Sequence, residues 1–143
     1  MADVSILRTL ARLLLGAFLV FAGVAHFAAT DAFLGQVPPW LPARTLVVQV
    51  SGVVEIVLGL ALLLTPAPRR AWVGLAVAGF FVVVFPGNIS QLVSGADSFG
   101  LDTAGARVTR LFFQPLLVAW ALWSTGAWAL LADRWRARSR SRA

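Results

Sequence analysis

The sequence predicts an all-α integral membrane protein, a single transmembrane domain over residues 1–143 built as a four-helix bundle. Of the 143 residues, 59% are hydrophobic and 13% are charged, whereas soluble domains average about 45–50% apolar and 25% charged residues. Four apolar segments are each long enough to cross a hydrocarbon core of about 30 Å, which takes about 20 residues. These predicted spans cover residues 6–28, 46–64, 71–93 and 108–131.

The first segment also has features of a secretory signal peptide. Arg8 and Arg12 form a basic amino-terminal region, and Gly23-Val24-Ala25 could serve as a small-residue cleavage site. The apolar run nevertheless continues without a break to Ala29. This continuity favours a retained span over a cleaved leader.

The arginines divide unevenly between the two ends of the predicted bundle. One end has Arg8, Arg12, Arg69, Arg70 and the five arginines of a basic tail at residues 132–143, and the other has Arg44, Arg107 and Arg110. Because short cytoplasmic loops carry the excess of basic residues, both termini are predicted to be cytoplasmic in a multi-pass protein of the bacterial inner membrane. The tail could also hold anionic lipid, but a role in fixing the topology is the favoured one.

Composition excludes several classes of function. The net charge of +6 would suggest nucleic-acid binding in a soluble protein, but these arginines lie beside apolar segments, so the predicted partner is the lipid bilayer and not nucleic acid. The chain has no cysteine and one histidine, which excludes disulfides, thiolate metal sites, Fe–S ligation and a two-histidine haem site. We predict no metal, no covalently bound cofactor and no self-contained catalytic motif.

The first outer loop, residues 30–44, contains Pro38, Pro39 and Pro42, which forbid a regular helix there. Trp40 lies between them and suits the membrane interface, where an amphipathic ring sits at headgroup level. The loop is predicted either to lie on the bundle as a lid or to act as a stiff connector.

The third span contains Pro86, which cannot donate a hydrogen bond to the carbonyl of Val82. A kink is therefore predicted there, and the freed backbone groups need partners within the bundle. Asn88, the only asparagine, follows two residues later.

Glu55 is the only glutamate and lies inside the second span. An acidic side chain at the bilayer centre costs about 2.5–3.5 kcal/mol, so it normally faces the bundle interior and finds a partner there. Ser51, Gly52 and Gly59 keep the surrounding helix face small, so a neighbouring helix can approach closely. Arg110 is the cation predicted to meet Glu55 as a hydrogen-bonded intramembrane ion pair.

Polar residues from all four spans fall at a similar depth, in the outer half of the predicted bundle, while the inner half is nearly all aliphatic. This polar cluster, which predicts an outward-facing pocket, consists of His26, Ser51, Glu55, Asn88, Gln91, Arg110 and Gln114. A structural interpretation stays open beside it, in which one ion pair and several interhelical hydrogen bonds only hold the bundle together.

Several short motifs in this order resemble the DoxX-like family of small bacterial membrane proteins, from Arg8 to Trp123. They are His26-Phe27, Pro38-Pro39-Trp40-Leu41-Pro42, Ser51-Gly52-Val53-Val54-Glu55 with Gly59, Phe85-Pro86-Gly87-Asn88, and Arg110-Leu111 with Gln114. The resemblance implies a four-helix membrane fold. It also suggests an association with membrane redox complexes, because some relatives are linked by name to a thiosulfate:quinone oxidoreductase subunit. Cysteines found in some redox-linked relatives are absent here.

Three functions follow as hypotheses. The first is a non-catalytic subunit of a membrane redox complex, whose pocket holds a quinone or similar small molecule, with Trp40 or Phe112 covering a ring. Such a chain would need a soluble or membrane oxidoreductase as its partner. The second is a small proton- or anion-linked transporter, in which Glu55 titrates and Arg110 attracts an anion. The third is a structural membrane anchor without a ligand.

Overall fold

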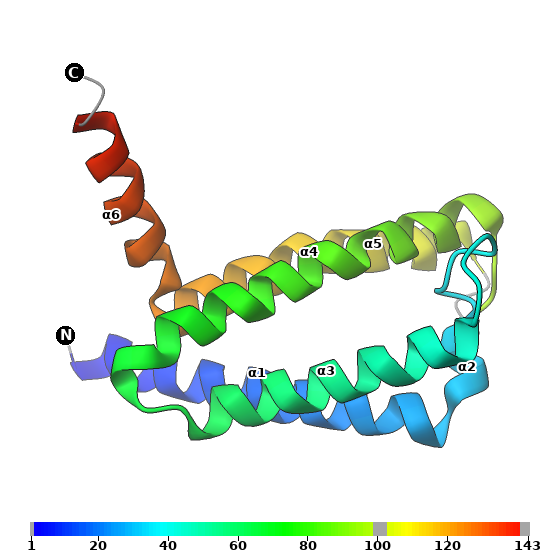
Figure 1. Ribbon diagram of the computed structural model, residues 1–143, viewed down its shortest axis with the longest axis horizontal. Coiled ribbons are helices and arrows are strands. Elements are labelled where there is room, and N and C mark those ends of the chain that lie inside the picture. Colours follow the sequence, from blue (N-terminus) through cyan, green and yellow to red (C-terminus); the bar gives the residue numbers. More distant parts are fainter. Residues whose placement is uncertain (1, 99–102, 141–143) are drawn as a thin grey trace.

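The computed structural model describes residues 2–98 and 103–140, and the described chain is entirely helical (Figure 1). The elements are α1 (Ala2–Ala28), α2 (Thr30–Leu34), α3 (Arg44–Leu64), the short 3₁₀ helix η1 (Ala67–Arg69), α4 (Arg70–Ser94), α5 (Ala104–Thr125) and α6 (Ala127–Arg140).

The helices α1, α3 and α4 contain the first three predicted spans. Within the described residues, these three helices are long and apolar enough to cross a membrane, and a fourth crossing is obtained only when α5 and α6 are taken together. The all-helical class and the apolar, membrane-compatible helices are therefore confirmed. The number of crossings is three or four.

The fourth predicted span, residues 108–131, is not a single helix but is divided between α5 and α6. The chain bends by 86° between α5 and α6. Gly126 lies at the bend with a φ of +76°, and a left-handed residue of this kind ends an α-helix. The predicted tail at residues 132–143 is helical as far as Arg140 and belongs to an element that already begins at Ala127.

The long helices form two closely packed pairs, α1 with α3 and α4 with α5, and α1 also contacts α5. Figure 1 shows the two pairs running side by side along the long axis of the molecule. The N-terminus, the turn between α3 and α4, and the start of α6 lie at one end, and α2 lies at the other.

Glycines bring α1 and α3 into close contact at two levels. A Cβ at Gly23 would lie 2.6 Å from the carbonyl oxygen of Gly52, and a Cβ at Gly59 would lie 2.7 Å from that of Gly16. Such distances leave no room for a side chain, so the two backbones meet directly, as small residues permit in membrane helices. The predicted small face of α3 is confirmed, and α1 is the helix that packs on it.

The half of the bundle away from α2 is filled by a core to which all four long helices contribute. The members of this core that are at most 1% exposed are Leu15, Leu19, Leu62, Val77, Ala121 and Ala127. A polar residue that the sequence analysis placed at the cytoplasmic surface lies in the same half. Arg12 is only 4% exposed and donates to the carbonyl of Leu62 at the end of α3. Arg12 thus satisfies a backbone group that the helix end leaves without a partner.

The helix α4 runs as a single element through Pro86. The carbonyl of Phe81, one residue before the carbonyl that Pro86 cannot reach, accepts a hydrogen bond from Gln114 Nε2 at 2.6 Å. A neighbouring helix therefore supplies a donor beside the proline, as expected for an interrupted helix in a bundle. The kink itself stays a prediction.

Candidate binding pocket

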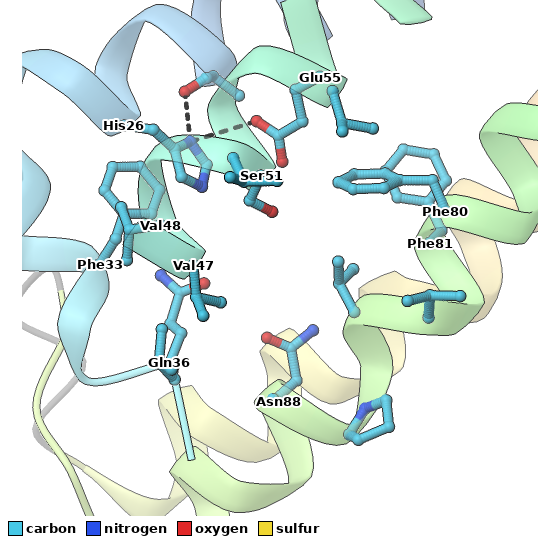
Figure 2. A pocket seen from close by; sticks show the side chains of 18 of the residues that line it. His26, Phe33, Gln36, Val47, Val48, Ser51, Glu55, Phe80, Phe81 and Asn88 are labelled. Atoms are coloured by element: carbon cyan, nitrogen blue, oxygen red, sulfur yellow. Dashed lines mark hydrogen bonds and ion pairs between the residues drawn. The ribbon is translucent and has the colours of Figure 1, made fainter. Parts of the chain in front are cut away.

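A cavity of about 980 Å³ lies between the α1–α3 pair and the α4–α5 pair, with α2 and the loop after it at one side (Figure 2). Its volume is at the upper end of the range of about 300–1,000 Å³ for small-molecule sites. Most of its wall is aliphatic or aromatic, and the polar side chains that reach it come from α1, α3, α4, α5 and the loop after α2.

The polar centre of one wall is formed by His26 of α1 and Glu55 of α3. His26 Nδ1 lies 3.3 Å from Glu55 Oε2 and 2.8 Å from the carbonyl oxygen of Ala22. Because a carbonyl oxygen can only accept, Nδ1 is the nitrogen that carries the proton. The ring stacks on Phe33, with 3.7 Å between the ring centroids, and Figure 2 shows its second nitrogen directed toward the cavity.

Glu55 keeps an unsatisfied oxygen at this wall. Its Oε2 is buried and has no hydrogen-bond partner among the described residues, although the His26 ring lies within ion-pair distance. Buried polar atoms normally have a hydrogen-bond partner. Because Oε2 is enclosed beside His26, a molecule bound in the cavity could contact this carboxyl group only through its other oxygen.

The predicted hydrogen-bonded contact between Glu55 and Arg110 is not formed: the ionisable group within ion-pair distance of Glu55 is His26, and Arg110 interacts with the carboxyl group electrostatically at longer range. The glycine contacts fix α3 on α1, which places His26 next to Glu55. By contrast, no described residue of α3 has its Cα within 8 Å of one in α5. Arg110 lines the cavity from α5, across the space that separates the helix pairs.

The opposite wall carries a hydrogen-bonded amide pair. Asn88 Nδ2 of α4 donates to Gln114 Oε1 of α5 at 2.9 Å, and Gln114 Nε2 donates to the Phe81 carbonyl. Both amide side chains are buried and line the cavity. These amides hydrogen-bond to each other and to the backbone without any ligand. They therefore fit a role in holding the bundle together better than the His26–Glu55 wall does.

The structure brings most of the predicted polar cluster to this cavity. The lining includes His26, Ser51, Glu55, Asn88, Arg110 and Gln114. Gln91 is buried elsewhere, and its amide donates to the carbonyl of Ala96 after the end of α4. Gln91 was predicted to join the cluster because it lies only one helical turn beyond Asn88. A similar depth in the bundle was not sufficient, because Gln91 does not line the cavity.

The loop after α2 lies against the bundle, and Pro38 and Trp40 reach the cavity while Pro39 and Pro42 do not. Whether it acts as a lid or as a stiff connector stays a prediction. Arg44 donates to the carbonyl of Leu34 and, at 3.2 Å, to that of Val37. These bonds hold the loop against the start of α3.

A second set of contacts ties this loop to the segment after α4. Gln36 Nε2 donates to Ser98 Oγ at 3.0 Å, and Ser98 Oγ donates to the carbonyl of Ala32 at 2.5 Å. On α4, a Cβ at Gly87 would lie 2.7 Å from the Gln36 carbonyl oxygen. The loop is therefore fixed on both helix pairs and closes one side of the cavity.

Several residues that line the cavity were not predicted from the sequence. Gln36 lies in a loop, where no periodicity marks an inward position, and Phe80 and Phe81 are two of many aromatic residues in apolar spans. Phe112, one of the two residues expected to cover a ring, is exposed outside this cavity, and its neighbour Phe113 lines it instead. Rotation of α5 about its axis decides between these neighbours, and hydropathy alone does not define it.

Within the described residues, no three histidine, cysteine, aspartate or glutamate side chains come together in a metal-binding group. A bound organic molecule is the kind of ligand that the lining fits. Its aromatic and aliphatic walls would contact rings or chains, and its few polar groups would fix the orientation.

Comparison with known proteins gives one finding. A family model described as Domain of unknown function (DUF8561) matches residues 15–125, while no curated protein and no solved structure matches the chain. The matched range begins within α1, ends with the last residue of α5 and includes every residue that lines the cavity. Because this range is well over half of the sequence, the chain belongs to the DUF8561 family.

Proposed function

We propose that this protein is a DoxX-like, multi-pass protein of the bacterial inner membrane whose cavity binds a quinone or a similar small molecule. In this proposal it acts as a non-catalytic subunit of a membrane redox complex. The observation that carries the proposal is the 980 Å³ cavity, in which the partly buried carboxyl group of Glu55, paired with His26, lies on an otherwise largely apolar wall.

The side chains around the cavity suit a flat ring with oxygen substituents. Phe80, Phe81 and Phe113 offer aromatic surface, and aromatic rings stack favourably on other π-systems. The hydroxyl of Ser51 and the guanidinium of Arg110 are hydrogen-bond donors on different helices. A ring placed between them would present carbonyl oxygens to both, which supports a quinone more than a purely hydrocarbon ligand.

Access from the side of the bundle supports a ligand that dissolves in the membrane. Several residues that line the cavity have large exposed fractions, including Val83 at 76% and Phe113 at 55%, so the cavity is not closed off from the surroundings. In a bilayer such apolar surface would face hydrocarbon, because lipid takes the place of water around these helices. A molecule with an apolar tail could then leave the tail among the lipids while its head occupies the cavity.

A transporter is the less well supported alternative. The half of the bundle away from α2 is closed by the packed core and by buried Arg12, which already donates to the end of α3. A path for ions would have to pass through side chains such as Leu15 and Val77, both 0% exposed. The structural-anchor alternative is favoured only by the Asn88–Gln114 network, which is complete without a ligand.

The sequence has no cysteine and a single histidine, so it lacks the residues of a thiol, Fe–S or two-histidine haem centre. The proposal therefore includes a partner oxidoreductase that exchanges electrons with the bound molecule. Copurification from native membranes in mild detergent, with mass spectrometry of proteins and lipids, tests both parts. We expect a quinone in the lipid extract and an oxidoreductase among the proteins.

A matched pair of variants tests whether the ligand occupies this cavity. Val54 lines it, and the adjacent Val53 is exposed and does not. Val54→Phe should fill part of the space and lower binding of a short-chain quinone by about tenfold or more, since a phenyl ring in a formed pocket costs over about 1.4 kcal/mol. Val53→Phe should bind as the unmodified protein does.

Equal quinone binding by the two variants would contradict the proposed site. If no quinone raises the melting temperature of the unmodified protein and none copurifies, the anchor interpretation stands. Solute or proton flux in liposomes that Val54→Phe blocks would instead support the transporter.

A further inference from the structure

The helix α6 is set apart from the bundle by its direction. It follows Gly126 and lies at 86° to α5 (Figure 1). α5 has 22 residues, or about 33 Å, which is long enough to cross a hydrocarbon core of about 30 Å without α6. If α5 crosses the bilayer alone, a helix at this angle runs nearly parallel to the membrane surface. The family match ends at Thr125, so α6 lies outside the part of the chain that defines the family.

One side of α6 carries an exposed apolar stripe. Trp128, Leu131 and Trp135 are spaced i, i+3 and i+7, which places them within about 60° of one another around a helix of 3.6 residues per turn. They are 65%, 42% and 75% exposed. Large apolar side chains aligned in this way on a short helix are typical of an interfacial amphipathic helix.

The rest of α6 is strongly basic. Its four arginines and one aspartate give it a net charge of +3, and Arg136 and Asp133 form an exposed pair at 3.6 Å. The arginines Arg134, Arg136, Arg138 and Arg140 alternate with other residues and lie on both sides of the apolar stripe around the helix.

A contact with α4 links the position of α6 to the bundle. The guanidinium carbon of Arg134 lies 4.5 Å from the centre of the Trp72 ring, a cation–π distance. Trp72 lies near the start of α4, two residues after Arg70. The basic helix therefore lies beside a basic turn, at the same end of the bundle as the N-terminus (Figure 1).

We infer that α6 is an interfacial helix that binds anionic phospholipid, with the Trp128–Leu131–Trp135 stripe in the acyl boundary and its arginines on lipid phosphates. Charge complementarity selects this partner, because the cytoplasmic leaflet is anionic and attracts basic segments next to a membrane helix. A role in topology alone needs only the arginine count. It does not need two tryptophans and a leucine aligned on one face of a helix perpendicular to α5.

Depth measurement in vesicles tests this inference on the full chain. The sequence has no cysteine, so one introduced cysteine carries a fluorescent label at a single site. Leu131→Cys places the label on the stripe, and Ala137→Cys is the matched control on the opposite side of α6. Each protein is reconstituted into phosphatidylcholine vesicles with or without about 30% phosphatidylglycerol, using lipids brominated in the acyl chain as quenchers.

We expect quenching at position 131 to exceed quenching at position 137 by about threefold or more in the anionic vesicles. The difference should shrink in neutral vesicles and at about 0.5 M salt, which screens charges beyond a few ångströms. Replacing the four arginines of α6 with glutamine, in a protein whose orientation is checked by protease accessibility, should abolish the dependence on anionic lipid.

Two results would overturn the inference. Equal quenching at the two positions would show that the stripe does not enter the membrane. Strong quenching at position 131 that is the same in neutral and anionic vesicles would show an apolar contact without recognition of lipid charge. Since the vesicles contain no other protein and the quinone pocket is not involved, neither result bears on the proposed function.

Discussion

Replacing Gly52 with alanine tests the close contact between α1 and α3 that sets His26 beside Glu55. A Cβ at Gly52 would lie 2.7 Å from His26 Cβ, 2.9 Å from the Gly23 carbonyl oxygen and 3.0 Å from Phe27 Cε2. Carbon atoms in contact are normally about 3.5–4.0 Å apart, so α1 would have to move away by roughly 1 Å. One obstructing atom is backbone and another is a Cβ, so a side-chain rotation cannot remove the clash.

The expected loss of stability follows from two opposing terms. Overpacking costs about 1–3 kcal/mol, and we expect the upper half of this range because the backbone must shift. Replacing a helical glycine with alanine returns about 0.5–1 kcal/mol. Gly52→Ala should therefore lower the free energy of unfolding by about 1–2.5 kcal/mol.

Gly79 in α4 provides the matched control. A Cβ there would meet nothing within 4 Å, so Gly79→Ala should keep only the helical gain and stabilise the protein by about 0.5–1 kcal/mol. Unfolding of the purified proteins by SDS in mixed micelles, followed by circular dichroism, measures both. A Gly52→Ala protein at least as stable as Gly79→Ala would refute the close approach of α1 and α3.

Three further predictions concern the charged groups and the topology. Arg12→Leu should cost about 2–4 kcal/mol in the same assay, because it leaves buried carbonyls at the end of α3 without a donor, whereas Arg8→Leu on the exposed surface should cost under about 1 kcal/mol. In double-mutant cycles, Glu55→Gln and His26→Ala should couple by about 1 kcal/mol, and more strongly than Glu55→Gln and Arg110→Gln, whose groups interact only at longer range. The reverse order would restore the arginine as the main partner of Glu55. Reporter fusions in the turn between α3 and α4 and at the C-terminus should read cytoplasmic and one between α4 and α5 should read outside, and a C-terminal fusion reading outside would contradict the orientation.

Hydropathy was enough to predict α1, α3 and α4, because a membrane-spanning helix is recognised by a long run of apolar residues. The same signal failed at Gly126, since apolar residues continue from α5 into α6 and hide the bend. The one indication of the bend in the sequence was Gly126, because a glycine can adopt a positive φ. A glycine inside an apolar run is common, however, and most of those in this chain lie within helices.

The polar wall was predictable in composition but not in pairing. Glu55 was expected to need a partner, and electrostatics alone favoured arginine over histidine. The choice between His26 and Arg110 depends on which helix packs on α3, and the glycines at positions 16, 23, 52 and 59 decide that. Arg12 shows the same difficulty. From the sequence, an arginine near the start of a helix is interpreted as a determinant of membrane orientation, and only the structure shows that its side chain reaches the end of another helix.

The glycine contact between α1 and α3 has a consequence for the order of assembly. During synthesis α1 and α3 emerge before α4 and α5, and their contact needs no residue from the later pair. Membrane helices insert individually and associate afterwards, so the first hairpin can close while the ribosome is still making the second. The His26–Glu55 wall would then be complete before its opposite wall exists. The later pair would dock onto a finished surface.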